Sequence, residues 1–220
     1  MLELPVLFLD ENLLAVNKPA GLPTLPDGYD KSAPCLVNLL RQQFDRVWVV
    51  HRLDKDTSGA IVLARSAAVH RALNIAFDSR EVRKIYHAIL IGAPHWDEYL
   101  VDLPLRPDGD RRHRTVIDRQ RGKPAVTRLR VLERFAQLTL IEARPETGRT
   151  HQIRAHLAAI DLPLAGDDLY GGGGATAIIA RTALHAHTIE LEHPATHQLL
   201  HVEAPYPPDF TQALRQLRGQ

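Results

Sequence analysis

The stretch His51-Arg52-Leu53-Asp54-Lys55-Asp56-Thr57-Ser58-Gly59 decides how this chain folds. An apolar run, residues 47–50, precedes it, and a second apolar run, residues 60–64, follows it. Two apolar runs around a polar stretch that ends in glycine predict a strand, a turn and a strand, with Asp54 at the bend. A carboxylate at the rim of a buried sheet is a candidate for catalysis. The alternative is that Asp54 and Asp56 make only local hydrogen bonds to backbone N–H groups of the turn.

Further motifs stand along the chain in a fixed order. They are Val16-Asn17-Lys18-Pro19-Ala20-Gly21-Leu22, Arg83-Lys84-Ile85-Tyr86, Thr147-Gly148-Arg149-Thr150-His151-Gln152-Ile153-Arg154, Gly166-Asp167-Asp168-Leu169-Tyr170-Gly171 and Leu184-His185-Ala186. With the nonamer, and in this order, they make the chain resemble the RluA family of RNA pseudouridine synthases from about residue 10 to residue 205.

The fold that this resemblance implies is the pseudouridine synthase fold. It is an α+β fold, with a bent, mostly antiparallel mixed sheet, flanking helices and a central cleft in which RNA binds. We expect residues 1–220 to form a single catalytic domain. Many members of the family carry an S4 domain before this domain, but the first predicted strand begins near Val6. We therefore expect no N-terminal S4 domain.

The hydrophobic pattern independently favours α+β, because hairpin-connected strands alternate irregularly with helices. Ser66 is the expected N-cap of a helix to Asp78, and Thr150 of a helix over residues 150–160. Strands are expected at residues 6–9, 13–17, 83–91, 125–132 and 136–143, with a closing hairpin at 187–191 and 198–202. In the strand over 83–91, Tyr86, Ala88 and Leu90 share one face.

The chemistry that the resemblance implies needs three side chains. Pseudouridine formation breaks the bond from uracil N1 to ribose C1′ and rejoins the base through C5. No atom is gained or lost, so we expect no cofactor and no metal. Asp54 supplies a carboxylate, which attacks C1′, attacks C6 or removes a ribose proton. Arg154 is its expected ion-pair partner, and Tyr86 is expected to stack on the uracil and to accept a proton.

Other cations are expected to bind the RNA. A base must leave the stack before it reacts, and Arg52, assisted by His51, is expected to occupy the space that it vacates. Arg149 and His151 lie at a predicted helix N-terminus, where they contact RNA or only cap the helix. Lys18, in the first motif, is also expected to contact RNA.

Net charge does not itself identify a nucleic-acid partner, since it is only +1. Residues 106–123, however, contain seven cations and three aspartates, an excess of four. Glycine and proline interrupt this segment, which predicts an exposed basic loop or twisted hairpin. We expect Arg111, Arg112 and Arg114 to bind RNA phosphates. The alternative is a solvated loop of mixed charge.

Composition is that of an ordinary globular protein, with 45% hydrophobic and 24% charged residues. Cys35 is the sole cysteine, so no disulfide can form within the chain. The N-terminus lacks the pattern of a signal peptide, and no apolar run approaches the roughly 20 residues that span a bilayer. We expect a cytoplasmic monomer that binds ribosomal RNA, transfer RNA or both. We expect it not to bind membranes.

Two other functions compete with an RNA-modifying enzyme. One is a non-catalytic RNA-binding or RNA-chaperone protein on a synthase fold. Binding alone does not need Asp54, Tyr86 and Arg154 together. The other is an unrelated aspartate-dependent hydrolase, which would need an acid partner or a metal beside Asp54. His185 and His187 have a spacing that could bind a metal, but no cysteine pair or His-Glu-x-x-His pattern accompanies them.

Overall fold

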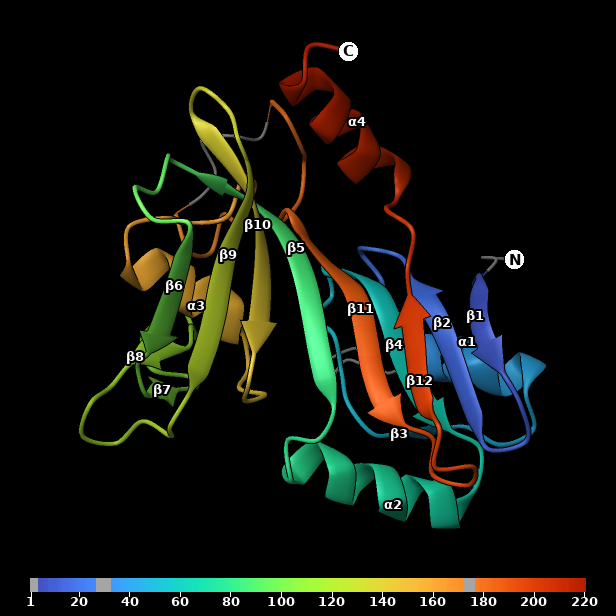
Figure 1. The fold of residues 1–220 in the computed structure, drawn as a ribbon. Helices are drawn as coiled ribbons and strands as arrows, with labels where there is room; N and C mark the ends of the chain where they lie inside the picture. Colours follow the sequence, from blue (N-terminus) through green and yellow to red (C-terminus); the bar gives the residue numbers. More distant parts are fainter. Residues whose placement is uncertain (1–3, 27–32, 172–176) are drawn as a thin grey trace. The chain divides into compact units, whose positions relative to one another are not determined.

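The computed structural model describes residues 4–26, 33–171 and 177–220 (Figure 1). The chain forms two compact units. Met1–Lys84 and Ala186–Tyr206 form the first unit, and Ile85–His185 and Pro207–Gln220 form the second. The chain therefore passes between the units three times. The expectation of a single catalytic domain stays a prediction.

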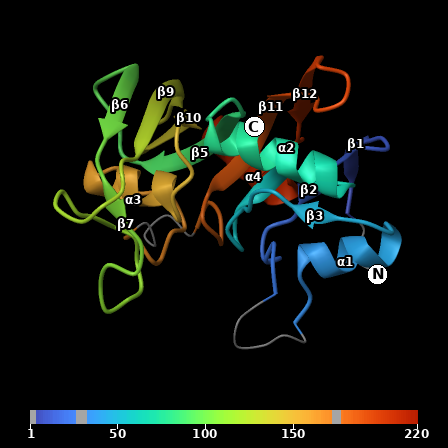
Figure 2. The same ribbon diagram turned by 90° about the horizontal axis from the view of Figure 1, so that it is seen from below.

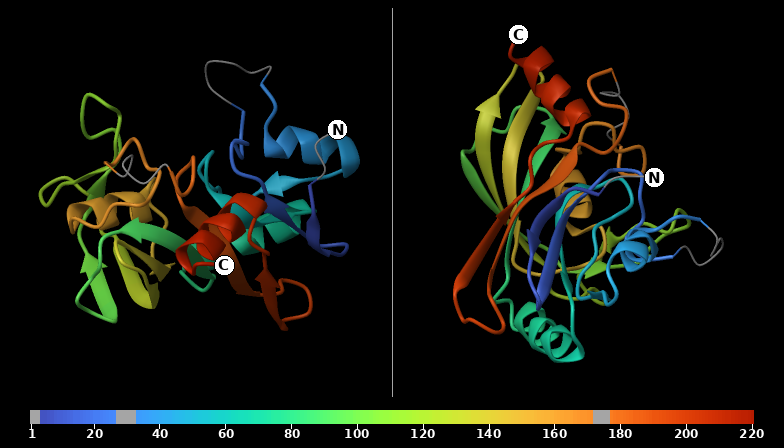
Figure 3. Two further views of the ribbon diagram at one scale, coloured as in Figure 1. Left: turned by 90° about the horizontal axis from the view of Figure 1, so that it is seen from above. Right: turned by 90° about the vertical axis from the view of Figure 1, so that its right-hand side faces the viewer.

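The first unit is built on an antiparallel sheet. Its strands are β1 (Val6–Leu9), β2 (Leu13–Lys18), β3 (Trp48–Val49), β4 (Ser58–Ala64), β11 (Leu184–Glu192, which begins in the second unit) and β12 (Leu199–Glu203). The order is β1-β2-β4-β11, with β3 also paired to β4 and β12 to β11. The predicted closing hairpin is confirmed as β11 and β12, orange to red in the right-hand view of Figure 3.

Helix α2 (Ala67–Asp78) closes the core of this unit. The Ser66 hydroxyl accepts a hydrogen bond from the Val69 N–H at 3.2 Å, so the predicted N-cap is confirmed. Val69 and Leu73 are buried against apolar side chains of β2, β4, β11 and β12. Helix α1 (Leu36–Gln43) buries Leu36, Val37 and Leu40.

The second unit contains a sheet in the order β5-β10-β9-β6. The strands are β5 (Arg83–Ile91), β6 (Glu98–Asp102), β9 (Val126–Arg134) and β10 (Leu138–Pro145). A separate two-stranded sheet joins β7 (Leu105–Arg106) to β8 (Val116–Ile117), and the helices are α3 (Gln152–Ala159) and α4 (Pro208–Leu217). The sequence analysis did not predict β6.

Helix α3 covers one face of this four-stranded sheet (Figure 2). Ile153 and Leu157 of the helix pack on Leu129 of β9 and Ile141 of β10. Along β9, Thr127 and Leu129 are buried and Arg128 and Arg130 are exposed, the alternation of a strand with one face on the core, and the strand expected at residues 125–132 is confirmed. No helix of the described ranges is both long enough and apolar enough to cross a membrane.

The start of α3 differs from the prediction. The helix begins at Gln152, and its N-cap is His151, not Thr150. His151 has a φ of 51°, in the left-handed region, and its side chain makes no capping hydrogen bond. The side chain of Gln152 instead accepts a hydrogen bond from the Arg149 N–H at 3.0 Å. This contact within the motif replaces a hydroxyl cap.

Candidate active site

The predicted strand–turn–strand element around Asp54 is confirmed. β3 and β4 are antiparallel, with Trp48 opposite Ala64. The turn between them begins at Asp54, whose carbonyl accepts a hydrogen bond from the Thr57 N–H at 3.2 Å. Asp54 is half-buried, whereas Arg52 is exposed.

The glycine that ends the motif is required by its surroundings. Gly59 has a φ of 118°, which other residues rarely adopt. A Cβ at this position would lie 2.2 Å from the carbonyl oxygen of Ala186. The close approach of β4 to β11 therefore leaves room for glycine alone.

Lys18 holds this turn from inside the protein. Its side chain is fully buried, and its ammonium donates hydrogen bonds to the carbonyls of Pro19 (2.9 Å), Leu22 (2.7 Å) and Lys55 (3.0 Å). Lys55 directly follows Asp54, so the ammonium joins the first motif to the turn. The expectation that Lys18 contacts RNA stays a prediction, and a fully buried ammonium bound to backbone carbonyls supports a structural role instead.

Thr24 holds the turn from the same segment. Its hydroxyl donates to the Leu53 carbonyl at 2.8 Å and accepts from the Leu53 N–H at 3.2 Å. The carbonyls of Pro23 and Thr24 also accept the N–H groups of Leu36 and Val37, at the start of α1. Residues 18–24 thus connect the turn of Asp54 to helix α1.

His51 is a neutral packing residue in this structure. Its Nε2 accepts a hydrogen bond from the Val62 N–H at 3.0 Å, and its ring stacks on Phe77 with centroids 4.7 Å apart. Burial, with a smaller effect from the Lys84 ammonium, lowers the pKa of His51 to about 3. An imidazole that stays neutral at pH 7 cannot pair with a phosphate as a cation. These contacts give His51 a packing role in this structure, and its RNA-binding role stays a prediction.

Tyr86 lies on β5 and is opposite Ala143 of β10. It packs at the edge of the apolar cluster that contains Ala88 and Leu90, as the predicted face of this strand requires. Lys84, two residues earlier, has a pKa lowered by burial.

Arg154 lies in the first turn of α3 and binds a carboxylate that the sequence analysis did not assign. Its Nε and Nη2 donate to the two carboxylate oxygens of Asp167, at 2.7 and 2.8 Å. Its guanidinium carbon lies 5.1 Å from the centroid of the Tyr170 ring. Asp54 belongs to the first unit and Arg154 to the second, so their pairing stays a prediction.

Buried polar contacts fix the third motif on the sheet. The Thr147 hydroxyl donates to Gln152 Oε1 at 2.6 Å. The Gln152 amide donates to the Val126 carbonyl at 2.9 Å and to the Thr127 hydroxyl at 3.0 Å. His156, one turn after Gln152, lies 2.9 Å from the same hydroxyl. These contacts attach the start of α3 to β9, and thereby place Arg154.

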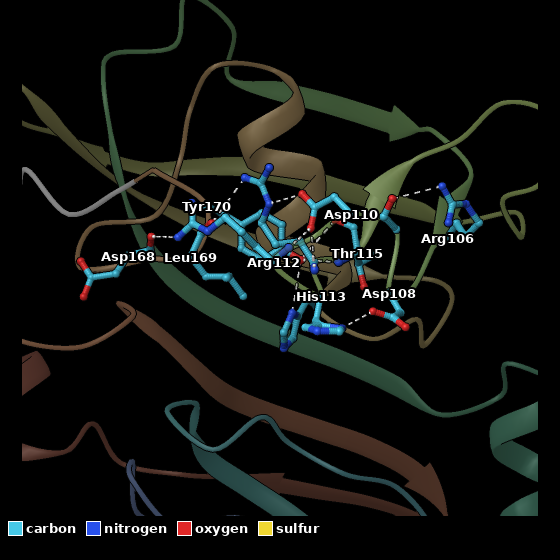
Figure 4. Close-up of polar contacts among 12 residues, drawn as sticks. Arg106, Asp108, Asp110, Arg112, His113, Thr115, Asp168, Leu169 and Tyr170 are labelled. Carbon is cyan, nitrogen blue, oxygen red and sulfur yellow. Dashed lines mark hydrogen bonds and ion pairs between the residues drawn. The ribbon is translucent and has the colours of Figure 1, made fainter.

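The predicted basic hairpin is confirmed as β7 and β8 with the loop between them, but its cations are not equivalent. Arg106 pairs with Asp118 at 2.7 Å, and Arg114 pairs with Asp110 at 2.7 Å. Arg112 is exposed but donates to the Asp168 carbonyl at 3.1 Å (Figure 4). Arg114 and Arg112 thus serve first to hold the loop, which their positions in the sequence did not indicate.

Four other cations of this segment are better placed to bind an external anion. Their side chains are exposed and form no ion pair within the described ranges. They are Arg111, Arg119, Arg121 and Lys123. Arg111 is the member of this set that the sequence analysis selected.

Arg149 and His151 both contact the protein. Arg149 Nε donates to the Pro124 carbonyl at 3.1 Å. His151 Nδ1 lies 3.2 Å from the Tyr170 hydroxyl. Their contact with RNA stays a prediction, since both side chains are only partly buried.

No predicted site residue lines the pocket of about 290 Å³ in the second unit. It is formed by Glu98, Tyr99, Leu100, Arg128, Leu129, Arg130, Glu142 and Arg144. Within the ranges that the structure describes, no group of three or more His, Cys, Asp or Glu residues is arranged to hold a metal ion. The expectations of no metal and no cofactor stay predictions.

Comparison with known proteins identifies relatives of the whole chain. Residues 12–159 match the family model of RNA pseudouridylate synthases. The Bacillus subtilis protein "Uncharacterized RNA pseudouridine synthase YhcT" is 40% identical, over 97% of this chain and 72% of its own length. "Ribosomal large subunit pseudouridine synthase D" of Pseudomonas aeruginosa is 39% identical, over 99% and 72%. "Dual-specificity RNA pseudouridine synthase RluA" of Vibrio vulnificus is 36% identical, over 93% and 84%.

A solved structure shares the fold. "Human RNA Pseudouridylate Synthase Domain Containing 4" superimposes with a TM-score of 0.79 at 27% sequence identity, over 97% of this chain and 93% of that chain. The predicted α+β pseudouridine synthase fold is therefore confirmed.

We predict that Lys18→Met lowers the free energy of unfolding without weakening the binding of phosphates. The substitution removes three hydrogen bonds from a charged donor, each of which contributes about 1.5–3 kcal/mol, so we expect a loss of at least about 3 kcal/mol. Urea unfolding measures it. The matched control is Lys55→Met, which removes an exposed ammonium next to the same turn and should change stability by less than about 0.5 kcal/mol. Normal stability with weaker RNA binding in Lys18→Met would restore the RNA-contact interpretation.

We also predict an acid sensitivity that depends on His51. The folded-state pKa of about 3 lies below the usual 6.5, so the unfolded chain takes up the proton first. His51 therefore contributes stability that is complete above pH 6.5 and is lost as the pH falls toward 3, by up to about 1.4 kcal/mol per pH unit. Urea unfolding at pH 7 and pH 5 should show a smaller difference for His51→Gln, whose amide can still accept the Val62 N–H. If the free energy of unfolding fell equally between pH 7 and pH 5 in the wild type and in His51→Gln, His51 would not be buried as a neutral ring.

Proposed function

Because the chain belongs to the RNA pseudouridylate synthase family, we propose that it isomerises specific uridines to pseudouridine in structured RNA, in large-subunit ribosomal RNA, transfer RNA or both. The observation that carries this proposal is the turn of Asp54, which a buried ammonium and the Thr24 hydroxyl fix in place. A carboxylate presented on so firmly held a turn is suited to act on a bound nucleotide.

The names of relatives support the choice of RNA. The Pseudomonas aeruginosa relative is named for the large ribosomal subunit, which supports ribosomal RNA as substrate. The Vibrio vulnificus relative is named for dual specificity, which supports a second class of RNA. Transfer RNA is the second class that the resemblance to the family implies.

Asp54 starts the reaction in this proposal. A carboxylate beside the glycosidic bond can attack C1′, attack C6 or remove a ribose proton, and each route leads to a detached uracil that turns and rejoins through C5. Arg154 supplies the cation that orients Asp54, and Tyr86 stacks on the uracil and accepts a proton. Arg154 also binds Asp167, through two of the five N–H donors of its guanidinium.

Base flipping precedes this chemistry. The target uridine must leave its stack, at a cost of a few kcal/mol. Arg52 is exposed, two residues before Asp54, and forms no ion pair with the rest of the described chain. A planar guanidinium can fill the space that the base vacates. We therefore assign Arg52 to the flipped state and not to bond making.

A cytoplasmic monomer that does not bind membranes completes the proposal. An RNA substrate, which the names of the relatives support, is the ground for the cytoplasmic location. The two competing functions differ in their products. An RNA-binding protein releases no tritium from RNA labelled at uridine C5, and a hydrolase would leave an abasic or cleaved RNA.

We predict that Asp54→Asn abolishes turnover and leaves RNA affinity similar. The amide keeps the size of the side chain but loses its charge and its nucleophilicity, so the rate should fall below about 1% of wild type. Tritium release from C5-labelled ribosomal RNA measures the rate, and filter binding measures the affinity. Asp56→Asn is the control, since it removes an exposed carboxylate from the same turn. Activity of Asp54→Asn above that level would refute the assignment.

A further prediction concerns the exposed cations of the basic hairpin. Replacing Arg111, Arg119 and Arg121 by Gln should weaken RNA binding and flatten its dependence on salt. Every arginine–phosphate interaction that the substitutions remove should lower the log–log slope by about 0.7 to 0.9. Replacing Arg114 instead should mainly destabilise the loop, because Arg114 is paired with Asp110.

The control for net charge removes three exposed arginines from the first unit, Arg46, Arg71 and Arg80. It lowers the charge of the protein by the same amount. If both triple variants change the slope equally, the hairpin does not bind phosphates specifically and is only solvated.

The role of Arg52 predicts a defect that depends on the substrate. Arg52→Ala should react slowly when the target uridine is stacked, and should be partly rescued when the target lies in an open loop, where the few kcal/mol of opening are largely absent. Stopped-flow fluorescence of 2-aminopurine beside the target follows flipping, and single-turnover tritium release follows chemistry. Wild-type flipping with failed chemistry would assign Arg52 to the positioning of Asp54 or of the RNA backbone.

A further inference from the structure

We infer that Asp167 and Tyr170 are positioning residues for Arg154, and that they link it to the basic hairpin. This inference rests on the proposed function, in which Arg154 orients the catalytic carboxylate. All the residues concerned belong to the second unit. Neither Asp167 nor Tyr170 was among the site residues that the sequence analysis selected.

Asp167 fixes one edge of the guanidinium. Its side chain is fully buried and binds Arg154 Nε and Nη2 with two nearly equal hydrogen bonds. Oδ1 of Asp167 also accepts the Tyr170 N–H at 3.2 Å. A bidentate pair of this kind fixes the plane of the guanidinium as well as its position. The remaining N–H groups then point in directions that Asp167 determines.

Tyr170 supports the same guanidinium through its ring. The guanidinium carbon of Arg154 lies 5.1 Å from the ring centroid and that of Arg114 lies 5.9 Å from it, both within the range of a cation–π contact. The ring is buried, and burial raises the pKa of Tyr170, so its hydroxyl stays protonated at neutral pH. A neutral tyrosine can therefore act as both donor and acceptor.

The hydroxyl of Tyr170 holds the basic hairpin. It accepts the Thr115 N–H at 2.9 Å and lies 3.2 Å from the Thr115 carbonyl, just before β8. From the hairpin, Arg112 and Arg114 donate to the carbonyls of Asp168 and Leu169. Figure 4 shows Arg112 and Thr115 of the hairpin beside Asp168, Leu169 and Tyr170. The hairpin and Arg154 thus share one support, the segment from Asp167 to Tyr170.

Restricting the guanidinium of Arg154 matters for catalysis. The flexible side chain of an arginine can adopt many rotamers, and a displacement of about 1 Å at a reacting centre can lower a rate about 100-fold. The buried carboxylate restricts Arg154 to one placement before RNA binds. Losing that restriction should lower the rate of the chemical step more than the affinity for RNA.

The chain contains a control pair with the same bidentate geometry, although its carboxylate is more exposed. Arg181 donates from Nε and Nη2 to the two carboxylate oxygens of Asp209, at 2.6 and 3.1 Å, also within the second unit. Neither residue has a role in the proposed function. Asp209→Asn therefore breaks a similar bidentate pair outside the site, and it reports the effect of reduced stability alone.

A double-mutant cycle on the full chain tests the inference. Asp167→Asn, Arg154→Lys and the double variant are compared by single-turnover tritium release, by RNA affinity and by thermal unfolding. Asp167→Asn should lower the single-turnover rate about 10- to 100-fold and change affinity by less than about threefold. Arg154→Lys already lacks the bidentate geometry. Adding Asp167→Asn to this variant should therefore lower its rate by less than about threefold. Asp209→Asn should have a similar small effect in both backgrounds.

Three outcomes would overturn the inference. A normal rate for Asp167→Asn, or an equal loss in both backgrounds, would leave Asp167 with only a structural role while Arg154 keeps its proposed one. A normal rate for Arg154→Lys would refute the proposed role of Arg154 and the inference with it. If Asp167→Asn does not fold, Asp167→Glu keeps the buried charge, displaces it by one methylene and enters the same cycle.

Tyr170 gives a second arm of the experiment. Tyr170→Phe keeps the ring beside Arg154 and removes the hydrogen bonds of the hydroxyl to the hairpin, whereas Tyr170→Leu removes both the ring and the hydroxyl. The single-turnover rate should fall more in Tyr170→Leu, and the salt dependence of binding should change in both. Equal rates in the two variants would show that the ring does not position Arg154.

Discussion

The contact of the Lys18 ammonium with the carbonyls of Leu22 and Lys55 is the constraint on which the candidate active site depends. Transferring a charged amine into a protein interior is costly unless it forms hydrogen bonds. Backbone carbonyls supply them here, and they can do so only when the first motif and the turn of Asp54 lie together. The cost of burying the charge therefore disfavours any arrangement in which the turn moves away. Thr24 strengthens the same link through Leu53.

In the second unit, too, a buried charge holds a proposed catalytic side chain, but here the buried charge is negative. There a buried carboxylate, Asp167, holds the cation that the proposed chemistry uses, and the Tyr170 ring supports it. Each proposed catalytic charge thus depends on a buried charged side chain elsewhere in the same unit. Catalysis by fixed charges requires such support, because a flexible charge would have to reorganise during the reaction.

The sequence predicted those parts of the structure that local patterns determine. The turn of Asp54, the Ser66 cap and the face of β5 that carries Tyr86 all follow from neighbouring residues. The roles of Lys18 and His51 did not. The side chain of Lys18 turns inward to backbone carbonyls, one of them 37 residues away, and His51 accepts the N–H of a residue on another strand. The pairing of Arg114 with Asp110 could not be predicted for a related reason, since the partner of a surface cation depends on how its loop folds. The segment of Asp167 and Tyr170 was recognisable as a motif, but its sequence does not indicate what it supports.

The central claim is that this chain converts uridine to pseudouridine in cellular RNA through Asp54. Mapping pseudouridines at single-nucleotide resolution in ribosomal and transfer RNA from a strain without the protein tests it most directly. At least one site should be uridine in that strain, should return to pseudouridine when the wild-type chain is restored, and should remain uridine with the Asp54→Asn chain. An unchanged set of pseudouridines in the strain, or restoration by Asp54→Asn, would contradict the account.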